Sequence, residues 1–573
     1  MTPNPRPQTP DPKSTDATIK ETFESIVIAF ILTFIFRAYV VEAFVIPTGS
    51  MAPTLLGRHA PVRCPQCGYR FAVDQSGRSL TADGARTTPC PMDGYPVPTP
   101  AGVPTRSGDR LLVQKYLYPL VEPRRWDVVV FRNPQALNAD GTAGPKTNYI
   151  KRLVGLPDEA LTLLDGNVHV RPLGGTDADW RIARKTDPRA NRRWEAIQRT
   201  AWQPVYHSRY VPLDHGRADQ DNDGEGRRFD WSPPWRPDPD AAADGVWNLG
   251  DAARGWRRSY LYAAGDSGRA GEAGRLIFDW ANYYPGGTPY PYNYTGTNRG
   301  VVPRQPIEDV RIAARYEASK NHGVVEFQTT ARLVSDVEIV TARFDPAGSV
   351  SLWRQGENNT DRTLVAKVDH RWGHDARGPS LRADLELWVV DQQVLVWVDG
   401  RVVIRESFDV PWDTLTTRPP PRNRPDVAIA VEGGYAVLHD VQLDRDLAYT
   451  PSNNGLEFAP LGVLRRSPQG GVIPTPPIEV RPRRYFVLGD NSPISEDGRF
   501  WGDAEPWVER RMLPEARDWV PDPDRPHVRP YAHVVPRGLL VGRAFFIYFP
   551  APYALSPGGR QVLPNFGQMR FVD

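Results

Sequence analysis

The first residue suited to chemistry is a serine in a tight turn. The segment 44–55 (FVIPTGSMAPTL) starts as an apolar, strand-like run and breaks at Pro47 and Gly49 before Ser50. Gly49 allows a sharp turn, so the Ser50 hydroxyl and amide can face one carbonyl group, and Thr48 adds a second hydroxyl donor. The pattern predicts a nucleophile at Ser50, although a serine after a glycine is also a common structural turn residue.

A lysine in an apolar segment could supply the matching base. Lys151 lies within 148–157 (NYIKRLVGLP), in a chain where arginine greatly outnumbers lysine. Arginine stays protonated in proteins, whereas a lysine among apolar neighbours can lose its proton near neutral pH and accept one from a hydroxyl. The alternative is a lysine on the solvated face of a strand.

A third segment, 485–502 (YFVLGDNSPISEDGRFWG), reads as a strand, a polar turn and a Ser-x-Asp-x-Arg cluster. Alone it is compatible with an Asx turn and an ion pair. Together and in this order, the three segments resemble the type I signal peptidases. The resemblance covers roughly residues 20–60, 105–165 and 480–550, with 125–131 (RWDVVVF) and 538–550 (GLLVGRAFFIYFP) matching further strands.

The resemblance implies a serine endopeptidase that needs no cofactor for catalysis and removes signal peptides from exported preproteins. It implies Ser50 as nucleophile and Lys151 as general base, with Thr48 and the Ser50 amide as the oxyanion hole. Small substrate residues before the cut would fit shallow pockets as the substrate adds as a strand. The supporting positions are Ser495 to orient the lysine, Asp497 and Arg499 as a bracing ion pair, and Met51, Leu55, Tyr149 and Ile150 as substrate contacts.

The sequence departs from the family pattern at three positions. Trp126 stands where the family has a glycine, Asp158-Glu159 replaces Gly-Asp, and Gly498 replaces a small hydroxyl residue. These changes put the loop geometry in question but leave the expected dyad intact.

The elements that must position this site begin with an apolar N-terminal segment. Residues 23–36 (FESIVIAFILTFIF) are almost uninterruptedly apolar, and a helix over 22–43 would be roughly 30 Å long, about the thickness of a bilayer core. The basic residues before it predict a cytoplasmic tail over 1–21 and an extracytoplasmic peptidase domain held at the cell membrane, in contact with lipid. A buried core helix is the alternative, because Arg37 interrupts the run.

All three cysteines lie in one insertion, 60–97, within the first peptidase part, 44–165. Cys64 and Cys67 form a C-P-x-C-G turn, and Cys90 opens a second turn in which Asp93 stands at the fourth ligand position. The spacing is that of a zinc ribbon and indicates a structural zinc site, with His59 as another candidate for the missing ligand. A ribbon that has lost its metal is the alternative.

A larger insertion separates the two peptidase parts. Residues 166–305 lack periodicity and are expected to be irregular, whereas 306–450 show short alternating strands that resemble a laminin-G or concanavalin-like β-sandwich. Such a domain could bind a glycan or a protein, or be a spacer. A linker over 451–480 would lead to the second peptidase part, 481–573.

Composition favours a mainly β protein. The 573 residues include 59 prolines and 48 glycines, which favour short strands and turns. Lys+Arg 70 against Asp+Glu 68 gives a formal charge of +2, so nucleic acid is not an expected partner. The self-cleaving repressors share the Ser/Lys chemistry but carry a DNA-binding module where this chain has its apolar segment. The remaining alternative is a membrane-tethered glycan- or protein-binding protein with a non-catalytic peptidase scaffold.

Overall fold

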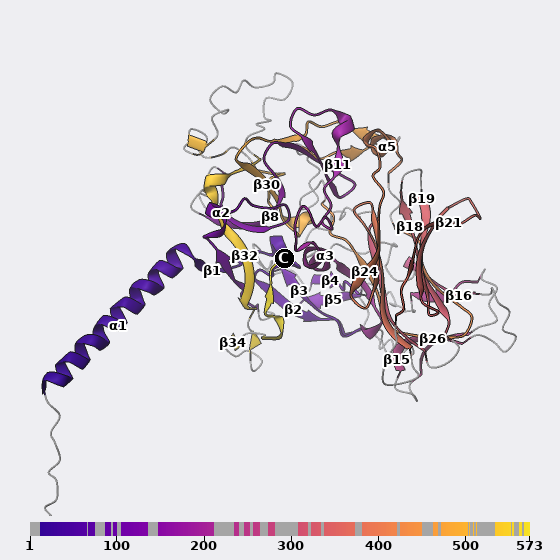
Figure 1. Ribbon diagram of the computed structural model, residues 1–573, viewed down its shortest axis with the longest axis horizontal. Coiled ribbons are helices and arrows are strands. Elements are labelled where there is room, and N and C mark those ends of the chain that lie inside the picture. Colours follow the sequence, from indigo (N-terminus) through magenta and orange to yellow (C-terminus); the bar gives the residue numbers. More distant parts are fainter. Residues whose placement is uncertain are drawn as a thin grey trace, which may run out of the picture.

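The expected mainly β architecture is confirmed. The computed structural model describes residues 12–65, 67–74, 86–92, 95–99, 105–135, 147–210, 234–239, 246–251, 256–263, 273–280, 308–318, 322–333, 337–372, 381–420, 424–449, 462–467, 471–501, 504, 508, 511–512, 533–551, 553–554, 561–563 and 566–573. Strands dominate this part of the chain, and helices are few. In Figure 1 one long helix extends away from a body made of sheets.

A central antiparallel sheet combines strands from both ends of the chain. Its order is β1-β6-β32-β7-β8-β30-β31, with β35 beside β32. Val-rich β7 and the apolar half of β8 are buried on both faces, which explains their nearly continuous apolar sequence. The strands are β1 (Val41–Val45), β6 (Arg110–Gln114), β7 (Val128–Arg132), β8 (Asn148–Gly155), β30 (Arg484–Leu488), β31 (Val535–Pro536), β32 (Leu540–Phe549) and β35 (Arg570–Phe571).

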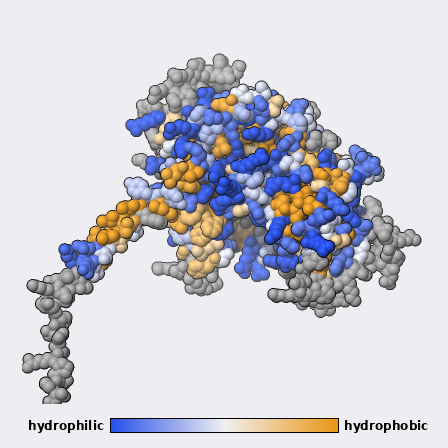
Figure 2. All heavy atoms as spheres, in the orientation of Figure 1, coloured by the Kyte–Doolittle hydropathy of each residue, from blue (hydrophilic) through white to orange (hydrophobic). Residues whose placement is uncertain are grey.

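Helix α1 (Pro12–Tyr39) precedes this sheet and points away from it (Figure 1). The expected span over 22–43 is not supported. The helix ends at Tyr39 because the next residues pair as β1 with β6, and no helix in the described part of the chain is long and apolar enough to cross a membrane. Figure 2 shows that hydrophobic side chains nevertheless gather along this projecting helix.

One row of paired residues crosses the sheet from the end of α1 to Lys151. Val41 is opposite Gln114, Gln114 is opposite Arg543, Arg543 is opposite Val129, and Val129 is opposite Lys151. Neighbouring strands are about 4.8 Å apart, so these four steps span roughly 19 Å. Lys151 therefore lies level with the point where α1 enters the sheet.

A four-stranded sheet packs beside the central one in the order β11-β10-β9-β29. Its strands share one apolar core with β8 and β30, which fixes the orientation of the central sheet. The bounds are β9 (Glu159–Leu164), β10 (Asn167–Pro172), β11 (Arg181–Ile182) and β29 (Ile478–Val480).

A two-layer β-sandwich forms the other half of the body, at the right of Figure 1. One sheet has the order β14-β15-β26-β17-β22-β23-β24 with β12 beside β26, the other β13-β16-β25-β18-β19-β20-β21, and both contribute to a single apolar core. The strands between 306 and 450 are β17 (Val310–Ala318), β18 (Val324–Arg332), β19 (Val337–Asp345), β20 (Ser349–Gly356), β21 (Thr363–Asp369), β22 (Leu381–Val390), β23 (Gln393–Val398), β24 (Arg401–Ser407), β25 (Val427–Glu432) and β26 (Tyr435–Arg445).

The segment 166–305 is less irregular than expected. Five of its strands complete the two sandwich sheets, and helix α3 (Trp194–Ala201) lies between the sandwich and the core of the central and four-stranded sheets. Three of these strands, β12, β15 and β16, pair with strands more than a hundred residues later, and burial that depends on such partners leaves little local periodicity. The five strands are β12 (Gln203–His207), β13 (Trp235–Pro237), β14 (Val246–Asp251), β15 (Trp256–Ala263) and β16 (Ala273–Phe278).

The cysteine segment forms two hairpins. The first pairs β2 (His59–Arg63) with β3 (Arg70–Asp74), and the second pairs β4 (Arg86–Pro89) with β5 (Pro96–Thr99). The three cysteines lie in the connections of these hairpins, and their side chains share a small apolar cluster.

The remaining described elements are short. They are helices α2 (Leu117–Leu120) and α5 (Trp412–Thr417), the single-turn helices η1 (Gly49–Met51), η2 (Asp177–Asp179), η3 (Ser208–Tyr210), η5 (Ser492–Ile494), η7 (Arg537–Leu539) and η8 (Phe566–Gln568), and strands β27 (Arg465–Arg466), β28 (Val472–Ile473), β33 (Tyr553–Ala554) and β34 (Gln561–Leu563).

Candidate active site

The structure brings Ser50, Lys151 and Ser495 together from three distant parts of the chain. Lys151 Nζ donates hydrogen bonds to Ser50 Oγ at 2.7 Å and to Ser495 Oγ at 3.0 Å. Ser50 lies in the single-turn helix η1, Lys151 in the middle of β8, and Ser495 directly after η5. A hydroxyl and an amine at this distance can exchange a proton directly.

Burial makes the Lys151 amine easier to deprotonate, which favours this proton exchange. Its side chain is 3% exposed, and desolvation lowers the pKa of the amine from 10.5 to about 8. The Asp497 carboxylate raises the pKa and the Arg499 guanidinium lowers it again. A substantial fraction of Lys151 is therefore neutral near pH 8 and can accept a proton.

Asp497 and Arg499 form the expected ion pair, fully buried, through two bonds of 2.8 Å. Asp497 also accepts a hydrogen bond from the Gly489 amide at 2.9 Å, and Arg499 donates to the Ser492 hydroxyl at 2.8 Å. The pair therefore fixes both ends of the turn that presents Ser495. Arg499 holds the pKa of the Asp497 carboxyl below its usual value, which keeps it ionised in spite of its burial.

Asn491 holds the nucleophile turn in place. Its amide donates to Ser50 O at 3.0 Å, and its side-chain amide donates to Gly49 O at 3.0 Å. Gly489 lies so close that a Cβ atom there would be 2.1 Å from Ser495 Oγ and 2.6 Å from Ser50 O. A side chain at Gly489 would therefore push apart two of the three reacting groups.

Asp490 connects the turn to both other segments. It forms a bidentate pair with Arg152 at 2.7 Å and 2.7 Å, and it accepts a 2.5 Å hydrogen bond from Thr54. Sequence reasoning assigned Asp490 and Asn491 only to a turn and gave Arg152 no role. The available signal was an arginine directly after Lys151 in an apolar strand, which needs a buried partner.

Thr48 and the Ser50 amide are the groups expected to form an oxyanion hole. Thr48 is exposed, and its hydroxyl is 3.4 Å from Ser50 Oγ. The Ser50 amide is at the start of η1, where helical N–H groups lack an intrahelical acceptor. Among the described residues it donates to no acceptor, so it is available to an incoming oxygen.

At two positions where the family has glycine, this chain has another residue but the backbone still adopts the left-handed conformation that glycine favours. Trp126 has φ 74° and Asp158 has φ 66°, both in the left-handed region. Trp126 is 1% exposed, and its Nε1 donates to Arg184 O at 3.1 Å, so contacts with the insertion offset the strained backbone. Gly498 has no room for a side chain, because a Cβ atom would be 2.5 Å from the Phe486 ring.

The expected substrate contacts fall into two groups. Tyr149 and Ile150 are half-buried on β8, next to Lys151. Met51 and Leu55 are completely buried in an apolar core with β6 and β7, so in this structure they support the nucleophile turn from below and do not line an open pocket.

The three cysteines gather as a metal site requires. Their Sγ atoms lie within 4.8 Å of one another, and those of Cys67 and Cys90 are 3.7 Å apart. The amides of Tyr69 and Met92 point at the Cys67 and Cys90 sulfurs, at 3.5 Å and 3.4 Å. Asp93 lies outside the described residues, and His59 is not part of the described cluster.

A family model described as "Signal peptidase, peptidase S26" matches residues 91–216. Signal peptidase I of Rickettsia bellii is 24% identical over 163 residues, which are 28% of this chain and 43% of that protein. The Rickettsia typhi protein is 27% identical over 28% of this chain and 46% of its own length. The probable signal peptidase I-2 of Synechocystis is 36% identical over 13% of this chain and 33% of that protein. The chain thus spans less than half the length of these relatives.

Among solved structures, the carbohydrate binding module CBM66 from Bacillus subtilis covers 37% of this chain and 95% of its own, at 12% identity and a TM-score of 0.21. Sheep galectin-11 covers 25% and 92%, at 15% identity and a TM-score of 0.15. At these TM-scores the similarity assigns no ligand to the sandwich.

Proposed function

We propose that this chain, a relative of the type I signal peptidases, is a serine endopeptidase that removes signal peptides from exported preproteins through a Ser50/Lys151 dyad. The observation that carries the proposal is the 2.7 Å contact between Lys151 Nζ and Ser50 Oγ, supported by the lowered lysine pKa. A non-catalytic scaffold would have no need for a buried lysine directed at a serine hydroxyl.

The chemistry follows from these contacts. Neutral Lys151 takes the Ser50 proton while Oγ attacks the scissile carbonyl carbon, and the resulting oxyanion is held by the Ser50 amide and the Thr48 hydroxyl. Protonated Lys151 then gives its proton to the leaving amine, and an ester to Ser50 remains. Lys151 next deprotonates a water that attacks this ester, which frees the acid product and restores the Ser50 hydroxyl.

The edge of β8 offers a place for the substrate backbone. β30 pairs with β8 only between Arg152 and Gly155, whereas β7 pairs along the other side from Asn148 to Arg152. Next to the dyad, the segment from Asn148 to Ile150 thus has no strand on the β30 side among the described residues. An extended peptide added there would bring its scissile bond to Ser50, with Tyr149 and Ile150 beside its side chains.

Helix α1 favours attachment to a cell membrane, with the catalytic sheet on the extracytoplasmic side. Its exposed apolar side chains include Phe23 at 68%, Phe30 at 60% and Phe34 at 64%. Exposed apolar surface of this kind marks contact with a membrane or a partner. Lys151 lies in the same row of paired residues as Val41, which follows the C-terminal end of α1. Membrane attachment through α1 would therefore hold the dyad close to the membrane surface, where a signal peptide emerges.

The test uses the full chain in detergent with a preprotein that carries Ala at the two specificity positions before the cut. We expect a product whose new N-terminus follows the second Ala. The same preprotein with Phe at both positions should be cut at least about a hundredfold more slowly, because the site cannot house large side chains. Equal cleavage of both substrates, or cleavage by Ser50→Ala, would contradict the proposal.

We also propose a structural zinc held by Cys64, Cys67 and Cys90. Zn–S bonds of about 2.3 Å at tetrahedral angles put two sulfurs about 3.8 Å apart, close to the 3.7 Å between Cys67 and Cys90. The fourth ligand is proposed to be Asp93. Elemental analysis should find about one zinc per chain, and Cys90→Ser should remove it; a zinc-free wild type purified without chelator would refute the site.

A further inference from the structure

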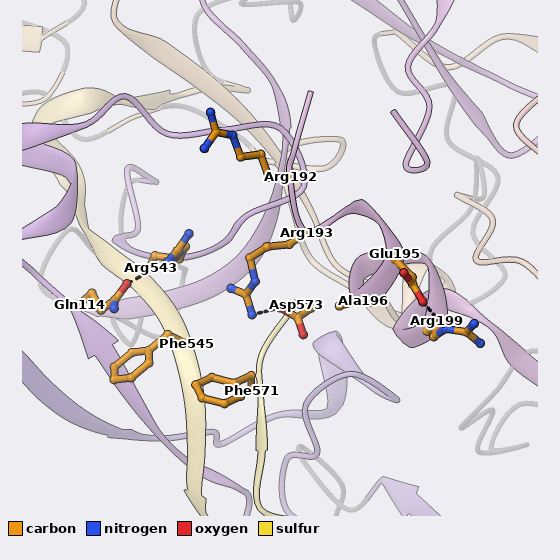
Figure 3. A pocket seen from close by; sticks show the side chains of 10 residues that line it. All are labelled: Gln114, Arg192, Arg193, Glu195, Ala196, Arg199, Arg543, Phe545, Phe571 and Asp573. Atoms are coloured by element: carbon orange, nitrogen blue, oxygen red, sulfur yellow. Dashed lines mark hydrogen bonds and ion pairs between the residues drawn. The ribbon is translucent and has the colours of Figure 1, made fainter. Parts of the chain in front are cut away.

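An open cavity of about 640 Å³ lies between the peptidase sheet and the insertion. Figure 3 shows its lining, which includes four arginines, Arg192, Arg193, Arg199 and Arg543, and two phenylalanines, Phe545 and Phe571. Two of the arginines come from the segment just before α3, one from α3 itself and one from β32. The insertion therefore builds a basic cavity that the peptidase sheet alone would not form.

Two of these arginines are neutralised within the cavity. Arg193 pairs with Asp573, and Arg199 pairs with Glu195 at 3.1 Å (Figure 3). Arg199 also lies over the Trp388 ring at 5.0 Å from its centroid, which fixes its position. The acidic side chains of the lining are thus engaged and do not compete for the remaining charges.

The other two arginines are less closely paired. Arg192 is exposed and forms no ion pair with any described residue. Arg543 is 3.9 Å from Asp127 and donates to Gln114 at 3.0 Å, but its Nε is buried with no hydrogen-bond acceptor among the described residues. Because the Arg543 side chain is 22% exposed at the cavity and is no closer than 3.9 Å to Asp127, its guanidinium is suited to bind an added oxyanion.

The cavity also has an apolar lining, and it lies near the C-terminal end of α1. Phe571 is 64% exposed, and Phe545 is half-buried. Gln114, which contributes to the lining, is paired with Val41, two residues after the end of α1. The Lys115 amide donates to the carbonyl oxygen of Val40, the residue after α1, and the chain then enters α2, whose Leu120 is an apolar residue with 78% exposure. An anion-binding group thus lies between apolar surfaces at the point where the apolar helix meets the sheet.

We propose that this cavity binds the phosphate of an anionic phospholipid headgroup, with Arg192 and Arg543 as the phosphate ligands and Phe545 and Phe571 against the glycerol and upper acyl region. The proposal rests on the membrane attachment proposed above. It adds a specific lipid contact made by the insertion and assigns the insertion a role in seating the catalytic sheet on the membrane.

The test measures lipid selectivity and not membrane binding as such, because α1 would bind any bilayer. The full chain in detergent is mixed with equal amounts of phosphatidylglycerol and phosphatidylcholine, and native mass spectrometry gives the ratio of the two bound lipids. We expect the wild type to favour phosphatidylglycerol. Each neutralised arginine should lower the ratio about fivefold, so Arg192→Gln should lower it about fivefold and Arg192→Gln with Arg543→Gln about 25-fold.

Arg401→Gln, an exposed arginine on sandwich strand β24, is the matched control and should leave the ratio unchanged. Arg192→Gln alters only an exposed side chain, so the test stands even where loss of Arg543 disturbs folding. A wild-type ratio near one, or an equal loss in Arg401→Gln, would overturn the proposal. Displacement of phosphatidylglycerol by an equal concentration of glycerol 1-phosphate would also overturn it, because the site would then take a free phosphate.

Cleavage of the preprotein by the same samples separates the two proposals. If the arginine variants lose their selectivity for phosphatidylglycerol but still cleave the preprotein in detergent, the lipid site is supported. A wild type that selects phosphatidylglycerol but cuts no preprotein would refute the proposed peptidase function and leave the lipid site standing.

Discussion

Asp490 forms a fully buried bidentate ion pair with Arg152, the residue next to the candidate base Lys151. Asp490 also accepts the Thr54 hydroxyl and precedes Asn491, which holds the carbonyl groups of Gly49 and Ser50. The Asp490 carboxylate therefore joins the turn that carries Ser50, the strand that carries Lys151 and the turn that leads to Ser495. The 2.7 Å approach of Ser50 and Lys151 depends on this junction.

Asp490→Asn should damage both stability and activity. Removing one charge of a buried pair leaves the other uncompensated, which costs about 3–5 kcal/mol in the free energy of unfolding. Displacement of the Ser50 turn by about 1 Å should lower kcat about a hundredfold. Urea unfolding and preprotein cleavage measure the two effects.

Asp384→Asn is the control for this experiment, because Asp384 pairs with Arg315 at 3.0 Å on the surface. An exposed pair contributes less than about 1 kcal/mol. If Asp490→Asn were no more destabilising than Asp384→Asn, the junction would not have the role given to it.

Gly489→Ala should abolish cleavage while the sheet remains folded. The added methyl would be 2.1 Å from Ser495 Oγ, so Ser495 and the Lys151 amine must move. Gly356→Ala, where the nearest atom would be 3.6 Å away, should be silent. Cleavage rate and circular dichroism of both variants test this, and an active Gly489→Ala would show that the contact can relax.

Activity should rise with pH. The dyad works only when Lys151 is deprotonated, and burial lowers the pKa of this amine to about 8. At pH 6 about 1% of Lys151 is then neutral, so kcat/KM should increase roughly tenfold per pH unit up to about pH 8 and then level off. A profile of kcat/KM that is flat between pH 5.5 and about 8 would argue against a lysine base.

Substituting glycine at Trp126 and at Asp158 should have effects of different size. Trp126→Gly relieves a strained backbone worth about 1 kcal/mol but empties a buried site, which costs about 3–5 kcal/mol. Asp158→Gly relieves similar strain at an exposed position and should leave the free energy of unfolding within about 1 kcal/mol of wild type. Thermal unfolding of the two variants distinguishes them, and equal effects would show that the Trp126 contact with Arg184 does not stabilise the fold.

The sequence singled out Ser50, Lys151 and Ser495 because each lies in a short segment that resembles a family motif, and the structure places their side chains in contact. It could not predict the contact of Asp490 with Thr54, since these residues are 436 positions apart. Met51 and Leu55, expected as substrate contacts, are buried in the structure. Both residues follow a turn, so no strand or helix period indicated that they face the core.

The strands of 166–305 were missed on other physical grounds. Strands β12, β15 and β16 pair with strands more than a hundred residues later in the chain, and β13 and β14 pair with β16 and β15. Burial of their side chains depends on these partners and leaves little trace in local periodicity. The arginine cavity arises in the same way, because α3 and β32 meet only in the folded chain.

The most direct test of the central claim is the single-turnover rate of preprotein cleavage in wild type, Ser50→Ala, Lys151→Ala and the double variant, with Lys367→Ala on the sandwich as control. The two groups act as a unit, so each single variant should fall at least about a thousandfold, to the same floor as the double variant. Lys367→Ala should match wild type. Cleavage by Lys151→Ala within about tenfold of wild type would contradict the dyad.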